Sequence, residues 1–176
     1  MSEKNTERLP LILVALCGGG WHRETVRVLE RFPRGEFRFA YAYGHQGGVH
    51  GASRLPMPFD GPCFPIHYLG PTRKSLSRFI LNPIRFFSSI IEAFDIVGRL
   101  RPDAVFVVGA ATAIPLFLAA RCFGATCVFI ESLTRVEKLS LTGRIVRRLG
   151  LADRLYVQWE RLSRELDGTH YAGAVL

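Results

Sequence analysis

Several features that would narrow the function quickly are missing from this sequence. The apolar run at 9–16 is far shorter than the roughly 18 residues that a membrane-spanning helix needs. The residues before it are polar and of mixed charge, and a glycine-rich turn follows it without a cleavage pattern typical of a signal peptide. We therefore expect neither a transmembrane helix nor a secretion signal.

Cysteine is scarce and shows no metal-binding pattern. None of the four cysteines belongs to a C-x-x-C pair, and three of them lie in apolar runs. We expect buried, reduced thiols in a cytosolic protein, with no disulfide and no metal site.

Acidic residues are also fewer than basic residues. The chain has 15 acidic and 23 basic residues in 176, a net charge of +8, and 48% of its residues are hydrophobic. This length and composition predict one folded domain over residues 1–176 with a substantial core. The charge favours an anionic partner: a membrane surface, nucleic acid or a phosphorylated substrate. Nucleic acid is the weakest of these, because no helix-turn-helix, zinc-finger or RNP-like pattern is present.

What the sequence does contain is an alternation of short apolar runs with amphipathic segments. Runs that are apolar on both faces and separated by helices are typical of a parallel sheet covered on both sides. The prediction is an α/β, Rossmann-like, three-layer fold. Strands are expected at 9–17, 37–43, 65–69, 103–109, 126–131 and 153–159, and helices at 22–31, 82–97, 114–123, 144–150 and 160–166.

Three segments directly follow strands and are candidates for a ligand crevice: 17–22, 109–115 and 131–143. In the first, Gly18, Gly19 and Gly20 permit a tight turn whose backbone N–H groups suit a phosphate. His22 follows as a candidate general base or hydrogen-bond donor. The alternative is a plain strand-to-helix turn with His22 as a helix cap, since no P-loop lysine is present.

A basic and apolar segment at about 71–97 is the candidate membrane contact. Bases interleaved with bulky apolar residues are typical of a surface that rests on anionic lipid. The alternative for its helical part is an apolar face that only covers the sheet. The proposed contact residues are Arg73, Lys74, Arg78, Phe79 and Arg85.

The polar cluster at 131–143, the end of the last strand and the carboxyl-terminal residues contain a characteristic set: Glu131, Ser132, Arg135, Leu139, Ser140, Gly143, Ala152, Asp153, Val157, Gln158, Trp159, Tyr171 and Gly173. This set resembles the Alg14 family and its bacterial PssD-like relatives in exopolysaccharide synthesis. The glycine turn and His22 resemble the family's first loop, although Trp21 stands where a glycine is usual.

The resemblance implies the N-terminal, acceptor-side half of a GT-B glycosyltransferase. It implies a membrane-associated subunit, peripheral on the cytoplasmic face, that binds a polyprenyl-diphosphate-linked sugar. An Alg13- or PssE-like partner would bind the UDP-sugar donor, so no cofactor is expected in this chain. The carboxyl end, 169–176, would help to hold that partner.

The resemblance also suggests roles for single residues. His22 would activate the acceptor hydroxyl, Glu131 would orient a sugar hydroxyl, and Arg135 would bind the diphosphate through its guanidinium. Ser132 and the glycine turn would contact substrate, as would Gln158 and Trp159 at the end of the last strand. Trp159 could instead contact the partner or simply pack in the core. A buried Glu131–Arg135 pair that only fixes the loop is the alternative for that pair.

Two other functions are also compatible with the sequence. The chain could be an anchor or scaffold for the catalytic subunit, with no ligand site of its own. It could also be a self-sufficient nucleotide-binding enzyme, but the second expected strand ends in Tyr41–Gly44 without an acid for a ribose.

Overall fold

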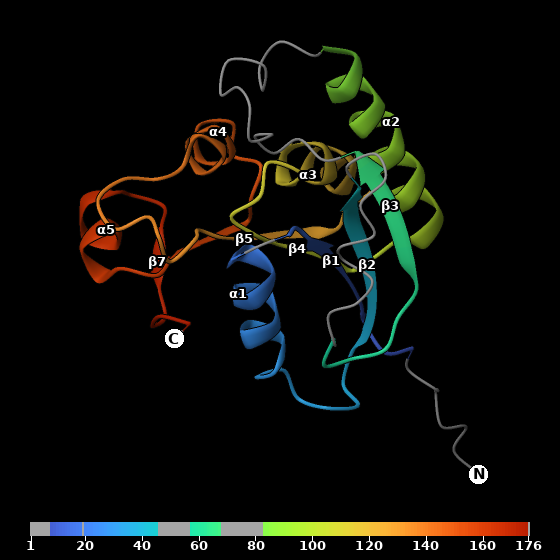
Figure 1. The fold of residues 1–176 in the computed structure, drawn as a ribbon, viewed down its shortest axis with the longest axis horizontal. Coiled ribbons are helices and arrows are strands. Elements are labelled where there is room, and N and C mark those ends of the chain that lie inside the picture. The colour runs from blue at the N-terminus through green and yellow to red at the C-terminus, as the bar shows by residue number, and fades with distance from the viewer. Residues whose placement is uncertain (1–7, 19, 46–56, 68–82, 176) are drawn as a thin grey trace.

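The computed structural model describes residues 8–18, 20–45, 57–67 and 83–175. Seven strands form one sheet in which every neighbouring pair is parallel (Figure 1). The strand order is β3-β2-β1-β4-β5-β6-β7. Their bounds are β1 Leu11–Leu16, β2 Arg38–His45, β3 Cys63–His67, β4 Ala104–Val108, β5 Thr126–Ile130, β6 Arg154–Val157 and β7 His170–Tyr171.

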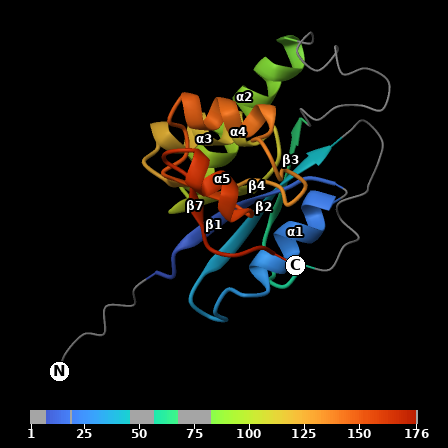
Figure 2. The same ribbon diagram turned by 90° about the vertical axis from the view of Figure 1, so that its left-hand side faces the viewer.

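Five helices accompany the strands in the described part of the chain. They are α1 Gly20–Leu29, α2 Pro83–Leu100, α3 Ala113–Cys122, α4 Leu141–Arg148 and α5 Glu160–Glu165. Helices α2, α3 and α4 lie on one face of the sheet and α1 lies on the other (Figures 1 and 2). The result is the three-layer α/β arrangement that the alternating pattern predicts.

Both faces of the sheet bury apolar side chains, which explains why β1 is buried along its whole length. One cluster packs the sheet against α2 and α3 and includes Leu13, Val97 and Phe117. The other packs it against α1 and includes Leu29 and Tyr41. Because all strands are parallel, their carboxyl ends meet at one edge, and the loops after β1, β4, β5 and β6 come together there.

The predicted strands and helices are confirmed, with boundary shifts of a few residues. One of the two largest shifts is at α4, which begins at Leu141 because the Ser140 side chain caps it by accepting a hydrogen bond from the Gly143 backbone N–H at 3.0 Å. The two-residue strand β7 was not predicted, because two residues cannot establish a periodic pattern.

Two expectations about burial need correction. Cys17 and Cys127 are buried, but Cys122 and Cys63 are exposed. Cys122 lies at the last position of α3. On α2 the expected apolar face is divided: Val97 is buried, whereas Phe87 is 63% and Ile91 is 70% exposed. The fully buried apolar residues of α2, Ala93, Ile96 and Val97, therefore all lie in its second half.

Candidate functional site

The glycine turn lies at the carboxyl end of β1, where α1 begins. Gly18 is exposed, and a Cβ added at Gly18 or Gly20 would meet nothing within 4 Å. Neither residue has a positive φ, so the backbone conformation does not require glycine at these two positions. Open space beside bare backbone at the start of a helix is what an approaching anion needs. Gly19 lies outside the described residues.

His22 is buried, not turned toward an open crevice as the sequence suggested. Its side chain is 2% exposed because it occupies an inward position in the first turn of α1. Its Nε2 has no hydrogen-bond partner among the described residues. Burial lowers the pKa of this imidazole, because desolvation disfavours the charged ring. Near pH 7 the His22 ring is therefore neutral, and its Nε2 atom makes no hydrogen bond to the described residues.

Glu131, at the end of β5, is 1% exposed and accepts three hydrogen bonds from its own loop. Its Oε1 accepts from the Ser132 N–H at 3.0 Å, and its Oε2 accepts from the Ser140 N–H and hydroxyl, both at 2.9 Å. Burial raises its pKa, and the hydrogen bonds from Ser140 and Ser132 and the charge of Arg135 oppose that shift. The carboxylate thus holds the 131–143 loop closed and fixes the cap of α4.

Arg135 does not form an ion pair with Glu131, which was the alternative reading of these two residues. Arg135 is exposed, and within the described part of the chain no carboxylate lies within ion-pair distance of its guanidinium. Ser132 and Ser140 donate hydrogen bonds to the Glu131 oxygens instead. The guanidinium is consequently available to an anion in solution.

Gly143 lies directly against the Glu131 carboxylate: a Cβ added at Gly143 would collide with Glu131 Oε2. A substitution at Gly143 therefore tests whether the hydrogen bonds hold that carboxylate in place. An alanine within a helix normally stabilises by about 0.5–1 kcal/mol over glycine. Gly143→Ala is expected to destabilise by about 1–3 kcal/mol instead, since the carboxylate is fixed by three hydrogen bonds and has nowhere to move. Urea unfolding measures this. Gly20→Ala in α1, where the Cβ enters open space, serves as control and is expected to be neutral or stabilising.

Glu24 on α1 is the residue that the sequence analysis missed. Its Oε1 accepts from the Ser132 hydroxyl at 2.9 Å, and its Oε2 accepts from the Leu133 N–H at 3.0 Å and from the Gln158 amide at 2.9 Å. One carboxylate therefore connects α1 to the loop after β5 and to the end of β6. A single glutamate in an amphipathic helix gives no signal of this; only the parallel topology brings the three segments together.

Ser132 and Gln158 are both 3% exposed and are bonded to the protein. The Gln158 amide also donates to the Glu131 carbonyl at 3.0 Å, and its oxygen accepts from the Val175 N–H at 2.9 Å. A substrate would have to displace these contacts to reach either side chain, so their binding role stays a prediction. Their observed effect is to join the strand ends to the carboxyl-terminal segment.

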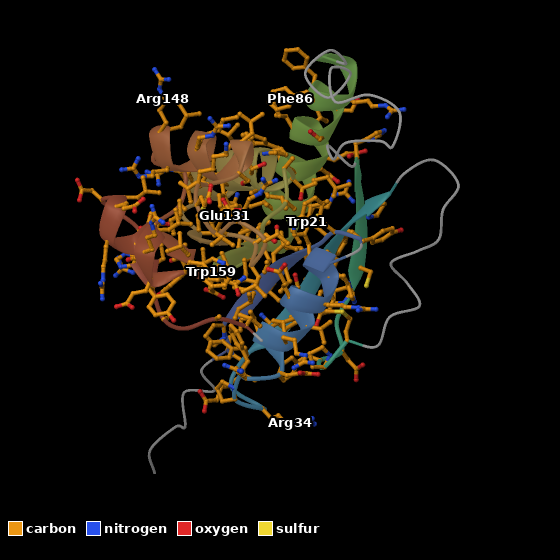
Figure 3. The ribbon with its side chains drawn as sticks, turned by 60° about the vertical axis from the view of Figure 1, so that its left-hand side comes forward. Trp21, Arg34, Phe86, Glu131, Arg148 and Trp159 are labelled. Atoms are coloured by element: carbon orange, nitrogen blue, oxygen red, sulfur yellow. The ribbon has the colours of Figure 1, made fainter. Side chains whose placement is uncertain are left out.

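Two tryptophans cover this edge of the sheet, in the same central region as Glu131 (Figure 3). Trp159 is 37% exposed, and its indole N–H donates to the Leu133 carbonyl at 2.7 Å. Trp21 packs over Gly109, whose φ is +61°, so closely that a Cβ at Gly109 would lie 2.8 Å from the indole ring. Trp21 thus fills space above β4, and the Thr112 hydroxyl turns inward to Cys17 Sγ at 3.4 Å.

The described residues bear on two expectations, the absence of a membrane-spanning helix and the absence of a metal site. No helix among the described residues is both long and apolar enough to cross a bilayer. The described ranges also contain no cluster of three or more histidine, cysteine or acidic side chains suited to a metal ion. Of the predicted membrane contacts, Arg73, Lys74, Arg78 and Phe79 lie outside the described residues, and Arg85 is exposed at the start of α2.

Solved structures share this fold. MurG of Acinetobacter baumannii superposes with a TM-score of 0.65 at 17% identity, over 96% of this chain and 45% of its own. UGT2 of Phytolacca americana, solved with UDP-2-fluoro-glucose and pterostilbene, gives a TM-score of 0.63 at 13% identity, over 96% of this chain and 54% of its own. The fold is therefore that of one Rossmann-like half of a GT-B enzyme.

Sequence comparison identifies the family. The family described as "Oligosaccharide biosynthesis protein Alg14 like" matches residues 12–175. UDP-N-acetylglucosamine transferase subunit ALG14 of Mus musculus is 30% identical over 121 residues, 65% of this chain and 55% of that protein. The Candida albicans protein of the same name is 30% identical over 173 residues, 93% of this chain and 78% of its own. The chain spans about half the length of the mouse, rat and human relatives. With the family match running through nearly every strand and helix described above, this chain belongs to the Alg14 family.

Proposed function

We propose that this chain is the acceptor-side, membrane-associated subunit of a two-component glycosyltransferase. It binds a polyprenyl-diphosphate-linked sugar at the cytoplasmic face of the membrane and recruits an Alg13- or PssE-like partner that binds the UDP-sugar. The observation that carries the proposal is the Alg14 family match over residues 12–175, whose curated relatives are named transferase subunits. Their names point to UDP-N-acetylglucosamine as the donor.

The geometry supports an acceptor site at the carboxyl ends of β1, β5 and β6. Arg135 is exposed and without an ion-pair partner in the described ranges, and the start of α1 is sterically open at Gly18 and Gly20. These are two ways to hold a diphosphate. Trp159 offers a half-open indole for a sugar ring. Tyr171, 44% exposed on β7, is available in the proposed partner-binding segment 169–176.

His22 is the candidate general base of this reaction. Its lowered pKa keeps the ring neutral near pH 7, and its Nε2 has no partner among the described residues that would compete for a proton. Since the ring is buried, it can accept a proton only from a hydroxyl that enters beside the first turn of α1. Glu131, whose oxygens are already occupied, would act on the acceptor through the shape of the loop rather than by direct contact.

The test is reconstitution. This chain and the donor-binding chain of the same organism are purified alone and together, then assayed with UDP-sugars and a short-chain polyprenyl-diphosphate sugar. Only the pair is expected to transfer sugar. His22→Ala in the pair is expected to lower the turnover rate about 10²- to 10⁴-fold. Arg34→Ala, at an exposed position after α1 and outside the site and the partner-binding segment, is the control. Full turnover with His22→Ala would remove the base assignment, and activity of this chain alone would refute the two-subunit proposal.

A scaffold without a ligand site is the second candidate, and one observation favours it. Three predicted ligand contacts, Glu131, Ser132 and Gln158, are buried and bonded to the protein itself. Calorimetry with the acceptor and this chain alone separates the two functions. Measurable binding that Arg135→Ala weakens supports the acceptor site, and the lack of any binding supports the scaffold.

A further inference from the structure

Helix α4 has an unusual composition for a surface helix. It contains Arg144, Arg147 and Arg148 and no acidic residue. Arg147 donates to the Asp167 carbonyl at 2.9 Å, but Arg144 and Arg148 are exposed and form no ion pair with any described residue. Leu141 at its first position is 43% exposed, and Leu149 directly after its end is 61% exposed. Exposed leucines beside unpaired arginines on one short helix describe an amphipathic surface of the kind that lies in a lipid interface.

This surface faces the same way as the exposed start of α2. Helices α2, α3 and α4 share one face of the sheet (Figures 1 and 2), and the Phe86 and Arg148 side chains project from the same side of the molecule (Figure 3). On α2, Phe86 is 37%, Phe87 63% and Ile91 70% exposed. Exposed apolar residues thus occur on two helices of one layer, with arginines beside them on both.

Acidic groups near α4 do not cancel its charge. A groove of about 810 Å³ between α4 and α5 contains Glu137, Glu165 and Asp167, but also Lys138 and all three arginines of α4. Glu165 is paired with Arg161 at 2.6 Å. On α2, Asp95 is paired with Arg99 at 2.6 Å, and a Glu92 oxygen lies 2.6 Å from a His67 ring nitrogen, a contact that neutralises Glu92 only when His67 is protonated. Around the groove four basic side chains outnumber three acids, one of which is paired with Arg161, so this surface has a net positive charge that complements an anionic bilayer.

We propose that α4, together with the first half of α2, forms a two-helix contact with an anionic lipid bilayer. This inference rests on the proposed membrane association and adds a second, independent element to the segment predicted at 71–97. It also has a geometric consequence for the site. Because Ser140 ties the start of α4 to Glu131, a bilayer that touches α4 lies beside the strand ends where the acceptor's diphosphate would bind.

The experiment is vesicle co-sedimentation of the full chain, with phosphatidylcholine vesicles that contain or lack phosphatidylglycerol. The double variant Arg144→Ala/Arg148→Ala is expected to bind the anionic vesicles about 25-fold more weakly, since each arginine near such a surface contributes about 5-fold. Arg144→Lys/Arg148→Lys keeps the charge and is expected to retain most of the binding. Phe87→Ser/Ile91→Ser is expected to weaken binding independently.

The matched control is Arg31→Ala/Arg34→Ala, which removes the same charge from exposed positions after α1. Arg34 lies at the opposite end of the molecule from Arg148 and Phe86 (Figure 3). This control is expected to change binding less than 2-fold at moderate salt, because charges far from the surface are screened. An equal loss in both double variants would overturn the proposal, since net charge alone would then explain the binding.

The remaining outcomes separate this inference from the proposed function. If the α2 variant loses binding and the α4 alanine variant binds like wild type, the α4 contact is refuted while membrane association stands. If wild type binds neither kind of vesicle, both the contact and membrane association fail, and reconstitution with the partner still tests the transferase separately.

Discussion

Replacing Glu24 with alanine is expected to lower the free energy of unfolding by about 3 kcal/mol. The change removes the acceptor of three hydrogen bonds, donated by the Ser132 hydroxyl, the Leu133 N–H and the Gln158 amide. The amide keeps its bond to the Glu131 carbonyl, and the hydroxyl still lies 3.1 Å from Thr134 Oγ1. Losing a charged acceptor for partly buried donors costs about 1–3 kcal/mol at each group, and the shared carboxylate makes the losses less than additive. Urea unfolding monitored by tryptophan fluorescence measures the change, and Trp159 reports on the same loop through its bond to Leu133.

Glu30→Ala provides the comparison for this experiment. Glu30 follows the end of α1 and is exposed, so its removal is expected to change stability by less than about 0.5 kcal/mol. A Glu24→Ala protein as stable as Glu30→Ala would mean that the contacts made by Glu24 are not needed to hold the strand ends. In the reconstituted pair, Glu24→Ala is also expected to lower transferase activity more than its stability loss explains, because the 131–143 loop would lose its tie to α1.

Replacing Glu131 with alanine is expected to have a comparable cost, about 2–4 kcal/mol. The Ser140 hydroxyl and the Ser132 and Ser140 N–H groups would lose their acceptor in a buried place, and α4 would lose the group that orients its capping serine. The cost is partly offset, because burying the carboxylate is itself unfavourable, as its raised pKa indicates. Thermal and urea unfolding measure the difference, and Glu160→Ala, an exposed residue of α5, is the control.

The pH dependence of stability distinguishes this explanation from simple loss of packing. An acid whose pKa is higher in the folded than in the unfolded protein binds more protons when folded, so stability falls as pH rises from the ordinary glutamate value through the raised one. Glu131→Gln removes that slope. If the difference in unfolding free energy between wild type and Glu131→Gln does not change over this pH range, the carboxylate is not strained by burial.

The sequence could predict the fold because its signal is repeated in every element. Runs such as Leu11–Leu16 and Ala104–Val108 are apolar on both faces, which only a covered parallel sheet requires, and the segments between them are long enough for helices. The same logic places the turn after β1 and the loop after β5 at one edge of the sheet. The location of the candidate site therefore follows from topology alone.

The partners of individual side chains could not be predicted in this way. For Glu131 the sequence left open a sugar hydroxyl or Arg135 as its partner, yet the backbone turn brings Ser140 to it instead. Glu24 was overlooked because its contacts are more than a hundred residues away in the chain. Charge and spacing identify a polar cluster, but which of its members are bonded to each other depends on loop geometry that no periodicity encodes.

The position of β1 in the sheet also has a consequence for biosynthesis. β1 lies between β2 and β4, with Ile12 opposite Ala104. At usual rates of synthesis, β4 leaves the ribosome roughly 5–20 s after β1. During that time one edge of a fully apolar strand has no neighbour, which is the situation in which nascent chains aggregate. We therefore expect this protein to depend on chaperones while it is made, and any fragment that ends before β4 to be insoluble.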